Sequence, residues 1–255
     1  MVLAVDIGNS NVVIGCFDGT DIRLLERMST NRHSTALEYA VLIKTVLELN
    51  GLEKHAFDGG IISSVVPSVT NMIKTAIEKL IGKPPLVVGP GCKTGLMIDR
   101  DNPAQLGSDR VADAVAAIQE YPCPIIIIDM GTATTISVVD QHKKFIGGMI
   151  MPGLRISAES LSSRTSQLPQ VSLDPPKKAI GRNTTDCMRS GIILGCASTI
   201  DGAIAHIEEE LGQACTVVST GGHAGIVTPF CRRNIIVDEK LLLKGMRHIY
   251  YKNAR

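Results

Sequence analysis

The 255-residue chain contains no Trp and has only four Phe and four Tyr, so its apolar side chains are mainly aliphatic. Hydrophobic residues still make up 44% of the sequence and charged residues 20%, which excludes the composition of an intrinsically disordered chain. A folded chain of this length buries roughly 70–75% of its unfolded surface. The sequence therefore allows one large core or two smaller domains.

An excess of charge of one sign is also missing. Lys and Arg number 26 against 25 Asp and Glu, which gives a formal net charge of +1. No stretch of five or more like charges occurs in the sequence. We therefore expect neither a nucleic-acid partner nor an anionic membrane surface.

Paired cysteine motifs and long apolar runs are absent as well. The seven cysteines are scattered without a CxxC spacing, which excludes a zinc ribbon or a disulfide framework and favours a cytoplasmic location. The apolar residues 1–5 end at Asp6 and predict a strand rather than a signal peptide. The most apolar later stretches, 124–128 and 145–154, are shorter than the roughly 18 residues of a membrane span, so no transmembrane helix is expected.

Hydrophobic periodicity and turn residues predict an α/β chain whose two halves follow the same order of elements. In the first half we predict strands at 2–5, 11–17, 22–28, 61–62 and 86–88, and helices at 37–49 and 67–81. In the second half we predict strands at 125–128, 134–139, 144–150, 216–219 and 235–237, and helices at 154–162, 184–211 and 239–250, with a loop at 165–178.

A short sequence motif also repeats between the halves. Residues 5–11 read Val-Asp-Ile-Gly-Asn-Ser-Asn and residues 128–134 read Ile-Asp-Met-Gly-Thr-Ala-Thr, each after a predicted strand. One copy alone would be an ordinary hairpin turn, in which Asp and Gly are common. Two copies at matching places favour phosphate binding, because glycine lets backbone amides approach an oxyanion and Ser, Thr and Asn add donors. Asp6 and Asp129 could each hold a cation against those phosphates.

These features resemble the superfamily of acetate and sugar kinases, heat-shock chaperone ATPases and actin. Within it, the chain resembles the type III pantothenate kinases over essentially its whole length. The resemblance is carried by the motifs at 6–11, 63–68, 93–95, 101–103, 107–110, 129–135, 181–184 and 220–222. It implies an α/β fold of two duplicated ribonuclease-H-like domains, mixed sheets flanked by helices, with an ATP cleft between them. We expect the domains at 1–115 and 116–255.

The resemblance also implies roles for individual residues. Asp109 falls on the family's proton acceptor for the substrate hydroxyl, and Asp129 on its ligand for K⁺ or NH₄⁺. A Mg²⁺ ion is expected near Asp6, directly or through water. The residues expected to bind ATP are Asp6, Ile7, Gly8, Asn9, Ser10, Asn11, Val12, Val13 and Thr132. Those expected to bind pantothenate are Gly107, Ser108, Asp109, Arg110, Thr184 and Arg100.

Each of these residues also has a purely structural interpretation. Ser108 and Asp109 open a predicted helix and could simply cap it, Thr184 could be the N-cap of the long helix, and Asp129 could merely end a strand. The chain also departs from common family residues at three positions. Arg100 stands where many members carry a substrate-contacting Tyr, Met130 replaces a common Phe, and Ser108 a common Ala.

The resemblance predicts a cytoplasmic kinase, a homodimer by family expectation, that uses ATP, Mg²⁺ and a monovalent cation to phosphorylate pantothenate to 4′-phosphopantothenate, the first step of coenzyme A biosynthesis. One alternative is a nucleotide-binding accessory or regulatory protein without enzymatic activity. Two further alternatives are a ribonuclease-H-like nuclease, which needs clustered carboxylates for two metals, and a sugar kinase of the same superfamily.

Overall fold

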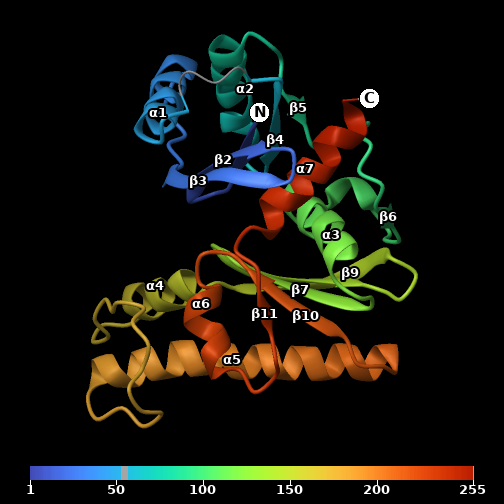
Figure 1. Cartoon of the computed structure of the whole chain (residues 1–255). Helices are drawn as coiled ribbons and strands as arrows, with labels where there is room; N and C mark the ends of the chain where they lie inside the picture. Colours follow the sequence, from blue (N-terminus) through green and yellow to red (C-terminus); the bar gives the residue numbers. More distant parts are fainter. Residues whose placement is uncertain (53–56, 255) are drawn as a thin grey trace. The chain divides into compact units, whose positions relative to one another are not determined.

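The fold is described from a computed structural model for residues 1–52 and 57–254 (Figure 1). The chain divides into two compact units, one made of Met1–Leu96, Asp101–Ala116 and Leu241–Arg255, the other of Met97–Arg100 and Ala117–Lys240. The expected boundary between residues 115 and 116 lies close to the point where α3 (Ser108–Glu120) passes from one unit to the other. The division differs from the expected domains mainly at the C-terminal helix, which belongs with the first unit.

The first unit is a five-stranded mixed sheet in the order β3-β2-β1-β4-β5. Its strands are β1 (Val2–Ile7), β2 (Asn11–Asp18), β3 (Asp21–Ser29), β4 (Gly59–Ser64) and β5 (Leu86–Val87). Its helices are α1 (Ala36–Leu49), α2 (Pro67–Ile81), the short η1 (Pro103–Gln105), the first part of α3 and α7 (Leu241–Asn253). The first three strands are antiparallel, and β4 and β5 run parallel to β1.

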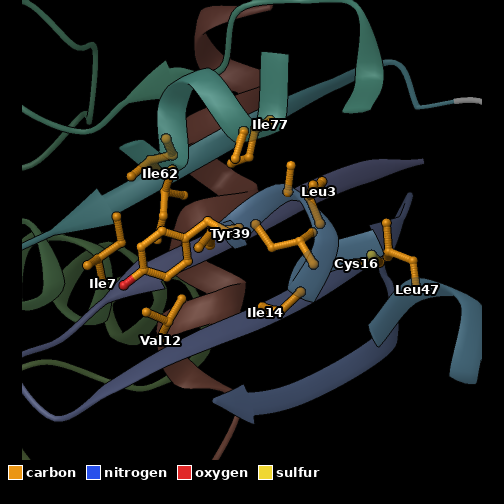
Figure 2. Close-up of a cluster of buried hydrophobic side chains, with 14 of the residues drawn as sticks. Leu3, Ile7, Val12, Ile14, Cys16, Tyr39, Leu47, Ile62 and Ile77 are labelled. Carbon is orange, nitrogen blue, oxygen red and sulfur yellow. The ribbon is translucent and has the colours of Figure 1, made fainter. Parts of the chain in front are cut away.

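Side-chain alternation along β4 shows why helices cover both faces of this sheet. A Cβ built on Gly59 would contact Tyr250 of α7, whereas one built on the adjacent Gly60 would lie 3.0 Å from Ile77 of α2. Neighbouring residues of a strand point to opposite faces, so α7 and α2 pack on opposite sides. The core on the α1 and α2 side contains Leu3, Ile7, Ile14 and Tyr39 (Figure 2).

Helix α7 is held on its face of the sheet by part of the chain's small set of aromatic residues. Phe17 of β2 is fully buried and meets the rings of Tyr250 and Tyr251 edge-on, with centroid distances of 6.2 and 6.0 Å. Edge-to-face pairs of this kind stabilise packing by about 0.5–1.5 kcal/mol beyond their buried area. These contacts explain why the C-terminal helix belongs to the first unit and not to the half of the sequence that precedes it.

The second unit repeats the topology of the first. Its strands are β7 (Ile125–Met130), β8 (Ala133–Val139), β9 (Lys144–Pro152), β10 (Thr216–Thr220), β11 (Ile236–Val237) and β6 (Met97–Ile98). The sheet order is β11-β10-β7-β8-β9-β6, so β9-β8-β7-β10-β11 matches β3-β2-β1-β4-β5, with the same pattern of parallel and antiparallel pairs. The predicted duplicated α/β fold is confirmed. The two-residue β6, which the sequence pattern does not predict, adds an outer strand beside β9.

Helices α4 (Leu154–Arg164) and α5 (Thr184–Leu211) cover one face of the second sheet, and the short α6 (Ala224–Val227) and η2 (Thr228–Phe230) follow β10. The long α5 passes beneath the sheet in Figure 1. By length and composition it is apolar enough to cross a membrane, with a mean hydropathy of 1.3 over 18 residues. No unbroken apolar run of that length marks it in the sequence. In the structure its buried residues, Ile200 and Ile204 among them, pack into the core of this unit, which accounts for that composition.

Candidate active site

The first Asp-x-Gly motif forms the hairpin turn between β1 and β2. Asp6 pairs with Val13 across the hairpin and with Ser63 of the parallel strand β4. The Gly8 amide donates to the Asn11 carbonyl at 2.9 Å, and a Cβ on Gly8 would lie only 3.0 Å from that oxygen, so the turn favours glycine. The Thr30 hydroxyl donates to the Gly8 carbonyl at 2.7 Å and holds the turn in place.

The residues expected to bind ATP in this turn differ in what they expose. Asn9, Ser10 and Asn11 are exposed at the tip and can offer amide and hydroxyl groups to a phosphate. Ile7 and Val12 are fully buried in the core, so only their backbone groups are available to a ligand (Figure 2). The motif therefore combines exposed polar positions at the tip with buried positions that anchor the turn.

The second motif forms the equivalent turn between β7 and β8. Asp129 pairs with Thr135 and with Thr220 of the parallel strand β10. The Gly131 amide donates to the Ala133 carbonyl at 3.1 Å, so Thr132 alone occupies the tip, where it is exposed. This turn is thus one residue shorter than the first, a difference that the shared letters of the two motifs do not reveal.

Glycines surround the carboxylate of Asp129. A Cβ on Gly131 would lie 3.7 Å from its Oδ1, and a Cβ on Gly221 would overlap that oxygen. Gly221 has a φ of +90°, which side chains rarely adopt, and it follows directly after β10. Without side chains, the backbone at both glycines can lie close to this carboxylate, at the turn where an ion or a phosphate oxygen is expected.

Gly153 supports the second turn from outside the motif. A Cβ at this position would overlap the Thr132 carbonyl and lie 2.7 Å from the Gly131 carbonyl. Sequence patterns do not identify this residue, because nothing in the sequence shows that the end of β9 returns to the turn. Gly153 is also the N-cap of α4, so one glycine serves the turn and the helix.

Asp109 is the second residue of α3. Its Oδ1 accepts a hydrogen bond from the Arg110 amide at 2.7 Å, and a Cβ on Gly107 would overlap the same oxygen. Burial raises the pKa of this carboxyl, while the hydrogen bond and the charge of Arg110 oppose the increase less strongly. A carboxylate with a raised pKa is a stronger base than an exposed one.

The start of α3 is joined to the end of β4 by Ser108. Its Oγ accepts a hydrogen bond from the Ser64 amide at 2.8 Å, and Ser64 pairs with Ile7 of β1. Ser108 therefore does not cap the helix with its side chain, as its structural interpretation proposed, but binds the neighbouring strand. Within the first unit this contact brings the 107–110 segment to the strand ends from which the first turn emerges.

Two of the expected pantothenate-binding residues, Thr184 and Arg100, belong to the second unit. Thr184 is not the N-cap of α5; that position is Asn183, whose side chain accepts from the Asp186 amide at 2.9 Å. Thr184 instead lines a largely apolar cavity of about 760 Å³ with residues of α4 and α5 and with Thr134. Arg100 is exposed and follows β6.

Carboxylates, histidines and cysteines do not gather into a metal site within residues 1–52 and 57–254, where no group of three or more could hold an ion. A cation at either turn would therefore be held by one carboxylate together with hydroxyl, backbone or phosphate oxygens. Mg²⁺ in phosphate-binding sites is usually held in this way. Asp6 and Asp129 fit that chemistry as single carboxylates beside glycine turns.

Comparison with known proteins assigns the family. The sequence model described as type III pantothenate kinase matches residues 2–206. The chain belongs to the type III pantothenate kinase family. It is therefore a kinase, and the family implies ATP as phosphoryl donor and pantothenate as acceptor.

Solved structures with the same fold cover nearly the whole chain. A Campylobacter jejuni protein named for the Baf family of transcriptional activators has 21% identity and a TM-score of 0.62, with 99% of this chain and 98% of that chain covered. Component A of (R)-2-hydroxyglutaryl-CoA dehydratase from Acidaminococcus fermentans has 14% identity and a TM-score of 0.57, covering 100% and 99%. ROK hexokinase from Thermus thermophilus has 13% identity and a TM-score of 0.53, covering 100% and 99%. At these identities the matches establish the fold alone.

Proposed function

We propose that this kinase transfers the γ-phosphoryl group of ATP to the primary hydroxyl of pantothenate, forming 4′-phosphopantothenate in the first step of coenzyme A biosynthesis. The observation that carries the proposal is the family match over residues 2–206 together with a buried carboxylate, Asp109, at the start of α3. A primary alcohol is a poor nucleophile at neutral pH, and a positioned base accelerates its attack by about 10²–10⁴-fold.

In the proposed mechanism Asp109 accepts the hydroxyl proton as the oxygen attacks phosphorus. Burial supports this role because it raises the pKa of the carboxyl, which makes the carboxylate a stronger base than an exposed aspartate. The main contribution of the other residues is to position the reactants and to stabilise charge, as in phosphoryl transfer generally.

We assign ATP binding to residues 6–13 of the first turn and to Thr132 of the second. The exposed Asn9, Ser10 and Asn11 offer polar side chains, and Ile7, Gly8, Val12 and Val13 offer backbone groups. Asp6 would hold Mg²⁺, directly or through water, and Asp129 a monovalent cation, K⁺ or NH₄⁺. When bound, both ions supply positive charge that offsets charge on the phosphate oxygens.

Pantothenate binding is assigned to Gly107, Asp109 and Arg110 of the α3 segment, with Arg110 suited to pair with the substrate carboxylate. Thr184 and Arg100 are proposed as further contacts, both being exposed. Ser108 was expected in the same set; its backbone could contribute, whereas its hydroxyl is already bonded to β4. We further propose, from the family resemblance, a cytoplasmic homodimer with no nucleic-acid or membrane partner.

A coupled assay of ADP release tests the reaction. The protein is supplied with ATP, Mg²⁺ and K⁺ together with pantothenate, a panel of sugars, or no acceptor. We expect ADP release with pantothenate only, and 4′-phosphopantothenate as the product by mass spectrometry. Release with a sugar would instead indicate a sugar kinase, and no release with any acceptor would favour the accessory nucleotide-binding protein.

The variant Asp109→Asn tests the proposed base. It keeps the size of the side chain and an oxygen that can accept from the Arg110 amide, so the protein should fold and bind ATP. Turnover should fall by about 10²–10⁴-fold. Asp21→Asn, an exposed position in the β2–β3 hairpin, is the control and should retain parental turnover. Near-parental turnover of Asp109→Asn would show that this residue is not the base.

A further inference from the structure

We propose that Ser108 is a positioning residue: its side chain joins the start of α3 to the end of β4 and so sets the position of Asp109, and its hydroxyl does not bind the substrate. The proposal rests on the proposed role of Asp109 as the base. It concerns the side chain immediately before that carboxylate, on the same first turn of α3.

The hydrogen-bonding capacity of the Ser108 hydroxyl is fully used within the protein. It accepts from the Ser64 amide at 2.8 Å, donates to the Ser64 carbonyl at 3.0 Å and lies 3.1 Å from the Ser63 hydroxyl. A serine hydroxyl has one donor and two acceptor sites, so these three partners leave none for a ligand. An additional bond to pantothenate would require one of them to break.

Because the Ser108 hydroxyl and its partners are buried, removing these hydrogen bonds should destabilise the protein. Ser63 is fully buried and Ser108 is 8% exposed, so water cannot readily replace the missing hydroxyl. Leaving a buried donor or acceptor without a partner costs about 1–3 kcal/mol. The loss would fall on the Ser63 hydroxyl and on the backbone groups of Ser64 at the end of a central strand.

The hydrogen bonds of Ser108 affect the position of Asp109 because these two residues are adjacent in α3. The carboxylate of Asp109 is further confined by the Arg110 amide and by Gly107, where a side chain would overlap it. If the Ser108 contact is removed, α3 can shift relative to β4 and carry the carboxylate with it. A misplacement of 1 Å at a reacting group can reduce turnover by about 100-fold.

A second hydrogen-bonded contact at the end of β4, made to α2 and not to α3, provides a matched control. The Ser64 hydroxyl lies 2.7 Å from the Thr70 hydroxyl and accepts from the Val66 amide at 3.1 Å, which joins β4 to the start of α2. Thr70→Val removes a hydroxyl from this neighbouring contact without touching α3. It should lower stability as Ser108→Ala does but leave the position of Asp109 unchanged.

The first experiment measures kcat and KM for Ser108→Ala, Ser108→Thr and Thr70→Val with pantothenate and ATP. A shift of a fraction of an ångström should lower the kcat of Ser108→Ala by about 10-fold, with KM for pantothenate within about twofold of the parent. Ser108→Thr retains the hydroxyl and should restore most of the turnover, and Thr70→Val should keep parental kcat. A raised KM with unchanged kcat in Ser108→Ala would overturn the proposal, since it would identify the hydroxyl as a substrate ligand.

The second experiment does not depend on activity. The Asp109 carboxyl is titrated by NMR with ¹³C-labelled aspartate, its signal being identified by its loss in Asp109→Asn. In Ser108→Ala, and more weakly in Ser63→Ala, the pKa should move from its raised value toward that of an exposed aspartate, because a released helix start lets in water. An unchanged titration in both variants would overturn the positioning role, whereas full turnover of Asp109→Asn would overturn only the proposed base.

Discussion

At the scale of the residue, surroundings decide what a carboxylate can do. Asp58 is exposed and accepts from the N-terminal ammonium at 2.6 Å, and this contact lowers its pKa. Burial at the start of α3 instead raises the pKa of Asp109. The same side chain is therefore a surface ion-pair partner in one place and a candidate base in the other.

The raised pKa of Asp109 predicts a pH-dependent effect on stability. The stabilisation of the folded state by the protonated Asp109 carboxyl is fully present below the pKa of about 3.9 that aspartate has in the unfolded chain. This stabilisation is lost as the pH rises through the higher pKa of the folded protein. Asp109→Asn, which cannot ionise, should therefore have a higher thermal midpoint than the parent at pH 7, and the difference should vanish near pH 4. Differential scanning calorimetry across this range measures it. A difference that grows toward low pH would contradict the assignment.

The environment of Asp129 predicts a response to monovalent cations. Replacing K⁺ by Na⁺ should slow turnover of the parent, because the site proposed at Asp129 is one for K⁺ or NH₄⁺. Asp129→Ala should lose both activity and the difference between K⁺ and Na⁺. Asp140→Ala, in the β8–β9 hairpin, serves as control and should keep both. A fully active Asp129→Ala with an unchanged cation response would exclude this site.

At the scale of the element, the conformation of each Asp-x-Gly turn depends on contacts with residues outside the turn. The first is held by Thr30 at the end of β3, and the second by Gly153 and by the loop after β10, where the His223 amide donates to the Met130 carbonyl at 3.1 Å. Strand pairing thus places each turn, and its neighbours fix its conformation.

Gly221 is the position at which this support can be tested. Gly221→Ala introduces a Cβ at a φ of +90° that would overlap the Asp129 carboxylate, so turnover and the K⁺ response should both fall. Gly225→Ala in α6 meets nothing within 4 Å and should leave both unchanged. Steady-state kinetics of the two variants, with circular dichroism to confirm folding, make the comparison. Parental kinetics for Gly221→Ala would contradict the close approach.

Helix α7 provides a prediction about stability in the first unit. A Cβ on Gly245 would overlap the Ala112 carbonyl of α3, so Gly245→Ala should lower the free energy of unfolding by about 1–3 kcal/mol. Gly202→Ala, in open space on α5, should instead raise it by up to about 1 kcal/mol through helix propensity. Urea unfolding measures both changes. Equal stability of the two variants would contradict the tight packing of α7 on α3.

At the scale of the whole molecule, the two sheets share one strand order, and each ends its first strand in an Asp-x-Gly turn. If both turns bind phosphates, a non-hydrolysable ATP analogue should slow amide exchange in residues 6–13 and in 129–134 together. Hydrogen exchange followed by mass spectrometry, with pantothenate alone as control, detects this. Protection of one turn only would contradict the proposal that both hold the nucleotide.

The sequence alone determined the duplicated α/β fold, the family resemblance and most elements. The helices predicted at 67–81 and 184–211 match α2 and α5, because their periodicity and their proline or glycine boundaries are local signals. The catalytic and binding roles that the sequence assigns to individual residues stay predictions. Their placement could not be read from the sequence, since each depends on contacts between distant residues.

Only the tertiary structure decided those long-range relations. It placed the C-terminal helix on the first sheet, brought Gly153 and Gly221 to the second turn, and bonded Ser108 to Ser64. Local propensity cannot specify such pairs, because burial and packing select one partner among many of similar chemistry. The sequence by itself thus determined the two turns and the carboxylates of the site. The packing of strands against helices determined which residues lie beside each carboxylate, because that packing joins residues far apart in the chain.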